Sequence, residues 1–297
     1  MSDRNVSQWL LGNNRYAGAV AKEPAVNWRN CKTISVTGGK GGVGKTSVSI
    51  KVAKLLAEAG NKVLLIDCDY NLSNTHIKLG LPLSNNIYSF VVKQVPFEEC
   101  LYKDGNFHLL SGCNGDVELF SNGLDLDKIV INILIEQERN YDYIVLDCPA
   151  GIAQENLTIN AYTDYRFVVI TPDKSSITDS YALMKILKTK YGVNENHLII
   201  NKVSSVAQYQ RMVKIISDTV DSYLQCRLHI LGNIFKNDQA IDLFDSILLS
   251  AEKNSLDDNF RKVVGRFTEE LEATGEIRND YCAKPVGSEQ NVHHVIS

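Results

Sequence analysis

A glycine-rich segment near the start of the chain has the composition of a phosphate-binding loop. Five of the seven residues from Gly38 to Gly44 are glycine, and residues 39–46 fit the pattern G-x-x-x-x-G-K-[ST]. Such a backbone curls so that successive N–H groups point at phosphate oxygens, and a following helix adds the positive end of its dipole. Lys45 can reach the β- and γ-phosphates, and the Thr46 hydroxyl can ligate Mg²⁺. The alternative is a glycine-rich turn that binds nothing, but the order of strand, loop, lysine and helix favours a nucleotide.

Three aspartates follow apolar runs that read as strands. Asp67 and Asp69 come directly after the run 62–66, and Asp147 ends the run 143–146. Ligands of α/β sheets bind at the carboxyl ends of parallel strands, where a carboxylate can hold Mg²⁺ directly or through water. One of Asp67 and Asp69 can organise metal-bound water and the other can orient an attacking water, with a helix cap or a solvated turn as the alternative. Gly151 can offer its N–H to a γ-phosphate.

Strand-like and helix-like segments alternate along the chain. The apolar runs are short and continuous, which indicates strands buried on both faces of a parallel sheet. The pattern predicts a doubly wound, mostly parallel α/β sheet with helices on both faces, the P-loop NTPase class. The expected strands are 33–36, 62–66, 107–110, 143–146, 167–170, 198–200 and 229–231, and the expected helices are 45–59, 125–138, 177–189 and 206–224.

Composition excludes several classes of protein. The chain has 297 residues, 44% of them hydrophobic and 22% charged, with a net charge of -4. These values exclude a wholly disordered chain and give no global field that would attract nucleic acid. No apolar run reaches the roughly 18 residues of a membrane span, and no secretory segment opens the chain. The seven cysteines include no Cys-x-x-Cys, so a reducing cytoplasm and buried thiols are expected.

The loop also contains a second lysine, Lys40, which a simple P-loop does not require. The run 39–46 with Lys40 resembles the deviant Walker A motif of the ParA/MinD ATPases. The resemblance covers roughly residues 32–272 and implies a homodimer that forms around two ATP molecules. It further implies that Lys40 crosses the dimer interface to the partner's nucleotide, so that ATP binding and dimerisation are coupled.

Two further segments extend the resemblance to the site residues. Residues 67–81 resemble the family's switch I segment, which makes Asp69 the water-positioning residue, and Asp-Cys-Pro-Ala-Gly at 147–151 resembles the MinD form of Walker B. Asn201, which a turn would also explain, matches the adenine-recognition position. The motifs and the resemblance together assign the cofactors ATP and Mg²⁺ and three sets of residues: catalytic Lys40, Lys45 and Asp69; nucleotide-binding Gly39, Lys40, Gly41, Gly42, Val43, Gly44, Lys45, Thr46, Ser47, Gly151 and Asn201; and metal-binding Thr46, Asp67 and Asp147.

One segment favours a particular branch of that family. Residues 171–185, with Ser-Ile-Thr-Asp-Ser-Tyr-Ala-Leu at their centre, resemble the corresponding segment of FlhG, also called FleN or YlxH. This resemblance implies regulation of flagellar number or placement by an ATPase that is slow without a partner. The implied partners are an FlhF-like GTPase, flagellar basal-body components or a flagellar transcription regulator. Two features depart from the family: the N-terminus lacks the Asp-Gln-Ala motif associated with FlhF, and Phe235 stands where proline is common.

The ends of the chain and the remaining alternatives complete the prediction. We expect an N-terminal extension over 1–31, the ATPase domain over 32–273 and a polar tail over 274–297. A helical apolar stripe at 256–271 has mixed charges on its other face, so packing on the sheet is favoured over a membrane anchor; weak attachment to the inner face of the cell membrane is the alternative.

The alternative functions are a MinD- or ParA-type partitioning ATPase, a carboxylate ligase and an iron–sulfur carrier. The carrier would need a cysteine pair near the C-terminus.

Overall fold

The computed structural model describes residues 31–69, 75–82, 86–112, 125–237 and 254–275, together with the single positions 245 and 249. The expected N-terminal extension, except for its last residue, and nearly all of the expected tail lie outside these residues. The described strands are β1 (Lys32–Thr37), β2 (Val63–Asp67), β3 (Leu101–Asp104), β4 (Phe107–Leu110), β5 (Tyr143–Asp147), β6 (Tyr165–Ile170), β7 (Glu195–Val203) and β8 (Arg227–Phe235). The described helices are α2 (Lys45–Glu58), α3 (Thr75–Lys78), α4 (Ile87–Val91), the 3₁₀ helix η1 (Phe97–Cys100), α6 (Leu126–Gln137), α7 (Gln154–Tyr162), α8 (Lys174–Tyr191), α9 (Val206–Tyr223) and α11 (Ser255–Ala273).

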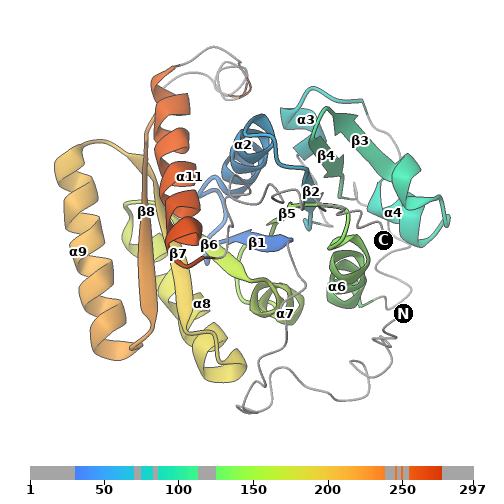
Figure 1. Ribbon diagram of the computed structural model, residues 1–297. Helices are drawn as coiled ribbons and strands as arrows, with labels where there is room; N and C mark the ends of the chain where they lie inside the picture. Colours follow the sequence, from blue (N-terminus) through green and yellow to red (C-terminus); the bar gives the residue numbers. More distant parts are fainter. Residues whose placement is uncertain are drawn as a thin grey trace, which may run out of the picture.

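One sheet joins all of these strands, in the order β3-β4-β2-β5-β1-β6-β7-β8 (Figure 1). Every neighbouring pair is parallel except β3 with β4, which are antiparallel. The predicted doubly wound, mostly parallel sheet is therefore confirmed. The strands β2 and β5 are buried at every position, as their uninterrupted apolar sequences predict.

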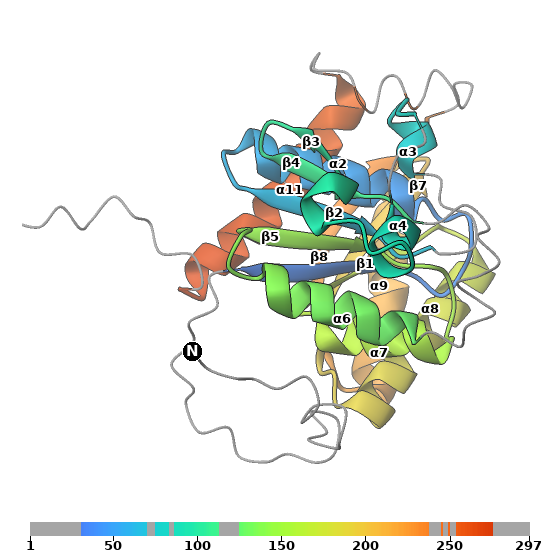
Figure 2. The same ribbon diagram turned by 90° about the vertical axis from the view of Figure 1, so that its right-hand side faces the viewer.

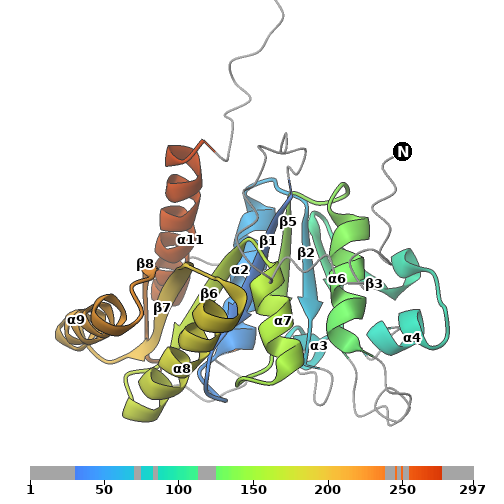
Figure 3. The ribbon, with the colours of Figure 1, turned by 90° about the horizontal axis from the view of Figure 1, so that it is seen from below.

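Helices cover both faces of the sheet (Figures 2 and 3). On one face α2 and α11 pack on β1, β5 and β6 through a core that includes Val36, Val145 and Phe167. On the other face α6 packs on β2 and β5, and α8 and α9 pack on β6 and β7. Alternate residues of each strand point to opposite faces, so a single central strand contributes to both cores.

Helix α11 carries the C-terminal apolar stripe and shows where that stripe packs. The six residues of the stripe are buried against the sheet and α2: Leu256, Phe260, Val263, Val264, Phe267 and Leu271. Packing on the sheet, the favoured prediction, is therefore confirmed for this stripe. Across the described residues, no helix combines the length and the apolar character that crossing a membrane requires.

Several elements were not predicted from the sequence. The short elements β3, α3, α4 and η1 carry too few residues to show a period, and α7 (Gln154–Tyr162) has almost no amphipathic pattern because both of its sides are partly buried. Helix α8 starts three residues before the expected position because Asp173 caps it, accepting a hydrogen bond from the Ser176 N–H at 2.9 Å. The five described cysteines are buried free thiols, as expected: Cys31, Cys68, Cys100, Cys148 and Cys226.

Candidate functional site

The glycine-rich loop joins the end of β1 to the start of α2, as the motif predicts. Gly44 has φ +97°, a left-handed conformation that favours glycine, and it directly precedes the first turn of α2. Gly39 lies against α8: a Cβ there would be 2.1 Å from the carbonyl carbon of Asp179, and its N–H donates to Ser180 Oγ at 3.3 Å. The path of the loop therefore requires glycine at positions 39 and 44, and α8 contacts the loop at Gly39.

Asn201 and Lys202, near the end of β7, hydrogen-bond to the backbone of the phosphate loop. Asn201 is buried, and its side-chain Nδ2 donates to the Val43 carbonyl at 2.8 Å, while its Oδ1 accepts from the Lys202 N–H at 2.8 Å. Lys202 donates from Nζ to the Gly42 carbonyl at 2.8 Å. The structure thus brings Asn201 to the phosphate loop, where it positions the backbone. Its role in recognising adenine stays a prediction.

Replacing Gly44 by Ala is expected to weaken ATP binding by at least about tenfold. A Cβ at Gly44 would lie 2.3 Å from Asn201 Nδ2, and the left-handed backbone adds a cost of about 1–2 kcal/mol for any other residue. Binding of a fluorescent ATP analogue measures the effect. Gly265→Ala is the matched control, because nothing lies within 4 Å of a Cβ there and its affinity should equal that of the unmodified chain. Equal affinities for both variants would contradict this account of the loop.

The aspartates converge beside the loop. Asp67 and Asp147 end the neighbouring strands β2 and β5 and are register partners, and both are buried. Ser49 Oγ, one turn into α2, donates to Asp147 Oδ1 at 3.0 Å, and Thr75 Oγ1 donates to Asp67 Oδ2 at 2.6 Å. The backbone N–H of Asp69 donates to Asp67 Oδ1 at 3.0 Å and fixes the chain that carries the Asp69 carboxylate. The expected gathering of carboxylates at this edge of the sheet is present.

The electrostatics of this cluster fit a divalent cation. Burial raises the pKa of Asp147 to about 7, with a further contribution from the adjacent Asp67, while hydrogen bonds from Thr46 and Ser49 act in the opposite direction. Burial lowers the pKa of Lys45, opposed first by Asp147. Two carboxylates packed together without a full counter-charge favour a cation between them, and the hard oxygen donors of Thr46, Asp67 and Asp147 are those that Mg²⁺ prefers.

Lys40 reaches a different part of the molecule. Its Nζ donates to Asp173 Oδ1 at 2.9 Å and to Ser175 Oγ at 2.7 Å, both at the start of α8. Hydrogen bonds from Thr171, Lys40, the Ser176 N–H and Ser175 hold the pKa of Asp173 well below its usual range. The second lysine of the loop is therefore bound within its own chain by the helix that also supports Gly39.

The remaining predicted residues are placed as follows. The Gly151 N–H donates to the Gly38 carbonyl at 3.2 Å, so this residue lies at the loop, but its contact with a γ-phosphate stays a prediction. Thr46 and Ser47 open α2. Leu72 and Asn74 of the predicted switch segment lie outside the described residues. Sequence reasoning missed Ser49, Thr75 and Asp173; only Ser49, four residues after Lys45 on one helix, had a positional signal.

Comparisons with known proteins agree with this geometry. The AAA domain family model matches residues 31–201. The antiactivator FleN of Pseudomonas aeruginosa is 28% identical over 204 residues, which cover 68% of this chain and 73% of FleN. The flagellum site-determining protein YlxH of Helicobacter pylori is 32% identical over 218 residues, which cover 70% of this chain and 71% of YlxH.

Solved structures show the same fold. The septum site-determining protein MinD of Pyrococcus horikoshii, in complex with Mg-ADP, superposes with a TM-score of 0.67 and 19% identity, covering 84% of this chain and 99% of that one. The matched family model spans more than half of the chain and includes the loop, both strand-end aspartates and Asn201. The chain belongs to the AAA-domain family of P-loop ATPases, in the MinD- and ParA-like group that includes the FleN and YlxH flagellar regulators.

Proposed function

We propose that this protein is an ATP-dependent dimerising switch that regulates the number or placement of flagella. The observation that carries the proposal is that the loop at residues 39–46 lies beside the buried pair Asp67 and Asp147. The second lysine of this loop, Lys40, is held by Asp173 at the start of α8. The likeness to FleN and YlxH supports the flagellar role over a division-site or partitioning role. The net charge of -4 gives no global field that would attract DNA, and the basic residues Lys185, Lys188 and Lys190 of α8 form only a short run.

The chemistry is the attack of water on the γ-phosphate of ATP. Lys45 and the loop N–H groups bind and orient the phosphates, and Asp69 orients the attacking water. Thr46, Asp67 and Asp147 would hold Mg²⁺, which would neutralise charge at the phosphates when bound. The protein thus contributes positioning and electrostatic stabilisation, without a covalent intermediate.

Lys40 connects nucleotide binding to dimerisation. In the monomer, Lys40 forms an ion pair with Asp173, and the two side chains are 39% and 43% exposed. A pair this accessible to solvent stabilises the fold by only about 0–1 kcal/mol. A cost of that size is small against a charge-assisted contact with a triphosphate across a dimer interface. Lys40 therefore leaves Asp173 when a second copy brings its nucleotide close, and hydrolysis reverses the change. Turnover is slow without a partner protein, because a switch needs a long-lived bound state.

Replacing Lys40 by Ala is expected to abolish the ATP-dependent dimer while leaving ATP binding in place. Size-exclusion chromatography with light scattering, with a non-hydrolysable ATP analogue and Mg²⁺, should show a doubled mass for the unmodified chain and a monomer for Lys40→Ala. Lys54→Ala is the control, because Lys54 lies on α2, outside the phosphate loop, and pairs loosely with Asp104 at 3.7 Å. A dimer that persists in Lys40→Ala would remove the crossing role from this lysine.

The partners follow from the same reasoning. An FlhF-like GTPase, flagellar basal-body components and a flagellar transcription regulator are the proteins that such a switch would control, from the cytoplasm or the inner face of the cell membrane. Affinity capture with the Asp69→Ala variant, held in its ATP-bound dimer, should enrich one of these classes relative to Lys40→Ala. Equal recovery with both variants would show that the dimer is not the signalling state.

A further inference from the structure

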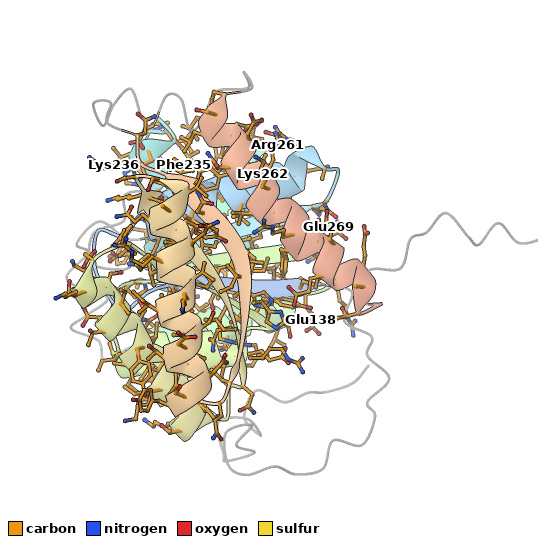
Figure 4. The ribbon with its side chains drawn as sticks, turned by 90° about the vertical axis from the view of Figure 1, so that its left-hand side faces the viewer. Glu138, Phe235, Lys236, Arg261, Lys262 and Glu269 are labelled. Atoms are coloured by element: carbon orange, nitrogen blue, oxygen red, sulfur yellow. The ribbon has the colours of Figure 1, made fainter. Side chains whose placement is uncertain are left out.

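Two histidines and a glutamate form a cluster that the ATPase does not use. His197 of β7 and His229 of β8 are register partners, and their rings stack with centroids 4.7 Å apart and planes at 14°. Glu270, in the last turn of α11, places Oε1 3.5 Å from His197 Nε2 and 2.6 Å from His229 Nδ1. Figure 4 views the side of the molecule that carries α11 and β8, the edge strand on which α11 packs. Three separate elements therefore converge on one point.

The polar atoms of this cluster are not fully satisfied. His197 is only 3% exposed, and its Nδ1 has no hydrogen-bond partner among the described residues; the same holds for His229 Nε2. These two atoms are the ring nitrogens turned away from Glu270, so the atoms that face its carboxylate and can bind an ion with it are His197 Nε2 and His229 Nδ1. Burial lowers the pKa of His197 to about 3, with contributions from His229 and Arg166. His197 is therefore neutral, which is the form that ligates a metal.

The distances between the three groups match a metal site. Zn²⁺ binds imidazole nitrogen and carboxylate oxygen at about 2.0–2.2 Å, so two ligands of a tetrahedral ion are roughly 3.3 Å apart. One ligand atom from each of the three residues can be chosen so that all lie within 4.8 Å of one another. The separation between His197 Nε2 and Glu270 Oε1 is near this value at 3.5 Å, and the separation between His229 Nδ1 and Glu270 Oε1 would open from 2.6 Å by less than roughly 1 Å. Because an imidazole binds a metal in the plane of its ring, the two rings, stacked at 14°, would turn out of their stack as the ion binds.

We propose that His197, His229 and Glu270 bind one Zn²⁺ or a similar borderline transition-metal ion, with water as the remaining ligand. Two imidazoles and one carboxylate favour Zn²⁺ over Mg²⁺, which prefers oxygen ligands alone. The cluster opens to solvent through His229 and Glu270, whose side chains are 22% and 28% exposed, so an ion can enter. Bound there, it ties the last turn of α11 to the β7–β8 edge of the sheet.

The surroundings are compatible with a cation. Glu195 lies 4.0 Å from His229 Nε2 and can support that imidazole from the second coordination shell. Arg166 is the positive group that acts on His197. Its guanidinium donates to the backbone carbonyls of Thr163, Asp164 and Glu195, and the carboxylates of Asp164 and Glu195 oppose its charge. The site is also separate from the nucleotide site. The register from Asp147 to His197 crosses three strand spacings, or about 14 Å.

Titration with Co²⁺ tests the site directly. The full chain carries His293→Ala and His294→Ala as background substitutions, because these neighbouring histidines can also bind metal. It is stripped with a chelator, freed of nucleotide and kept in excess Mg²⁺ to occupy the phosphate site. Visible d–d absorption should appear at one Co²⁺ per chain and disappear on addition of Zn²⁺. His229→Gln should lose these bands, and Glu270→Gln should weaken Co²⁺ binding at least about tenfold.

Controls separate loss of the site from loss of the fold. His108→Gln should keep the bands, since His108 bonds to Tyr141 and lies on β4, at the opposite end of the sheet from β7 and β8. His229→Gln should retain its circular dichroism and its ATP affinity. Zn²⁺ at about a hundredfold above Kd should raise Tm by roughly 5 °C in the background chain and not in Glu270→Gln. The proposal is overturned by absent bands in the background chain, by equal bands in His229→Gln, or by a thiolate charge-transfer band.

Discussion

Replacing Asp69 by Ala is expected to reduce ATP hydrolysis at least about 100-fold while leaving the ATP-dependent dimer intact. Asp69 follows β2 by two residues, and its backbone N–H is fixed by the buried carboxylate of Asp67. A positioned side chain that orients an attacking water contributes about 10²–10⁴ in rate. Phosphate release with saturating ATP and Mg²⁺ measures the first quantity, and light scattering of the same sample measures the second.

The two measurements together distinguish catalysis from binding. Asp218→Ala is the matched control, because Asp218 is an exposed aspartate on α9 and its loss should change neither quantity. A variant that loses both hydrolysis and the dimer would indicate that Asp69 supports nucleotide binding. Normal hydrolysis by Asp69→Ala would show that the assignment of the water-positioning residue is wrong.

Replacing Asp257 by Ala is expected to destabilise the fold by about 3–5 kcal/mol. Lys51 of α2 and Asp257 of α11 form an ion pair at 2.6 Å with side chains only 3% exposed each. Removing the carboxylate leaves the Lys51 ammonium buried without its counter-charge, which costs far more than the loss of a surface pair. Urea denaturation followed by circular dichroism gives the free energy of unfolding.

The control for this effect is an exposed ion pair whose lysine, like Lys51, lies on α2. Asp104 of β3 is the partner of Lys54, and its side chain is 59% exposed. Asp104→Ala should therefore change the unfolding free energy by only about 0–1 kcal/mol. The double substitution Lys51→Met with Asp257→Leu should regain most of the stability, since it leaves no buried charge. A single Asp257→Ala variant as stable as the unmodified chain would contradict the buried-pair account.

The same ion pair gives a pH dependence of known sign. Burial would raise the pKa of Asp257, but the bonds from Lys51 and Arg261 outweigh it and lower that pKa below the unfolded value. Its contribution to stability is therefore present above about pH 4 and is lost as the pH falls toward the folded pKa. Between pH 5 and pH 3 the unmodified chain should lose more stability than the uncharged double variant.

The predictable part of this molecule is local. The glycines of the loop, the lysine and threonine after them, and an aspartate at the end of an apolar strand each have a chemical meaning at fixed spacing. The long elements α2, α6 and α9 and the central strands were predicted within a few residues, because each carries a clear hydrophobic period. The short elements β3 and α4 were not predicted, since α4 has only five residues, too few for a helical period, and β3 is mostly polar and exposed, unlike the equally short apolar strand β4.

Contacts between distant segments could not be predicted in this way. Thr75 bonds to Asp67, Asp173 holds Lys40 and Asn201 holds Val43, and no spacing in the chain indicates any of these pairs. The stacked histidines of β7 and β8 are likewise 32 residues apart and meet only because the two strands align in register. Strand order and register arise from the packing of whole elements, which no short window of sequence contains.

The sequence alone determined that this chain builds a phosphate loop and places aspartates at the ends of two strands, because backbone freedom and side-chain chemistry are properties of neighbouring residues. The tertiary structure decided that Lys40 pairs with its own α8, that the apolar stripe of α11 packs on the sheet, and that His197 and His229 share the carboxylate of Glu270. These features depend on which distant side chains the assembled sheet and its helices bring within contact distance.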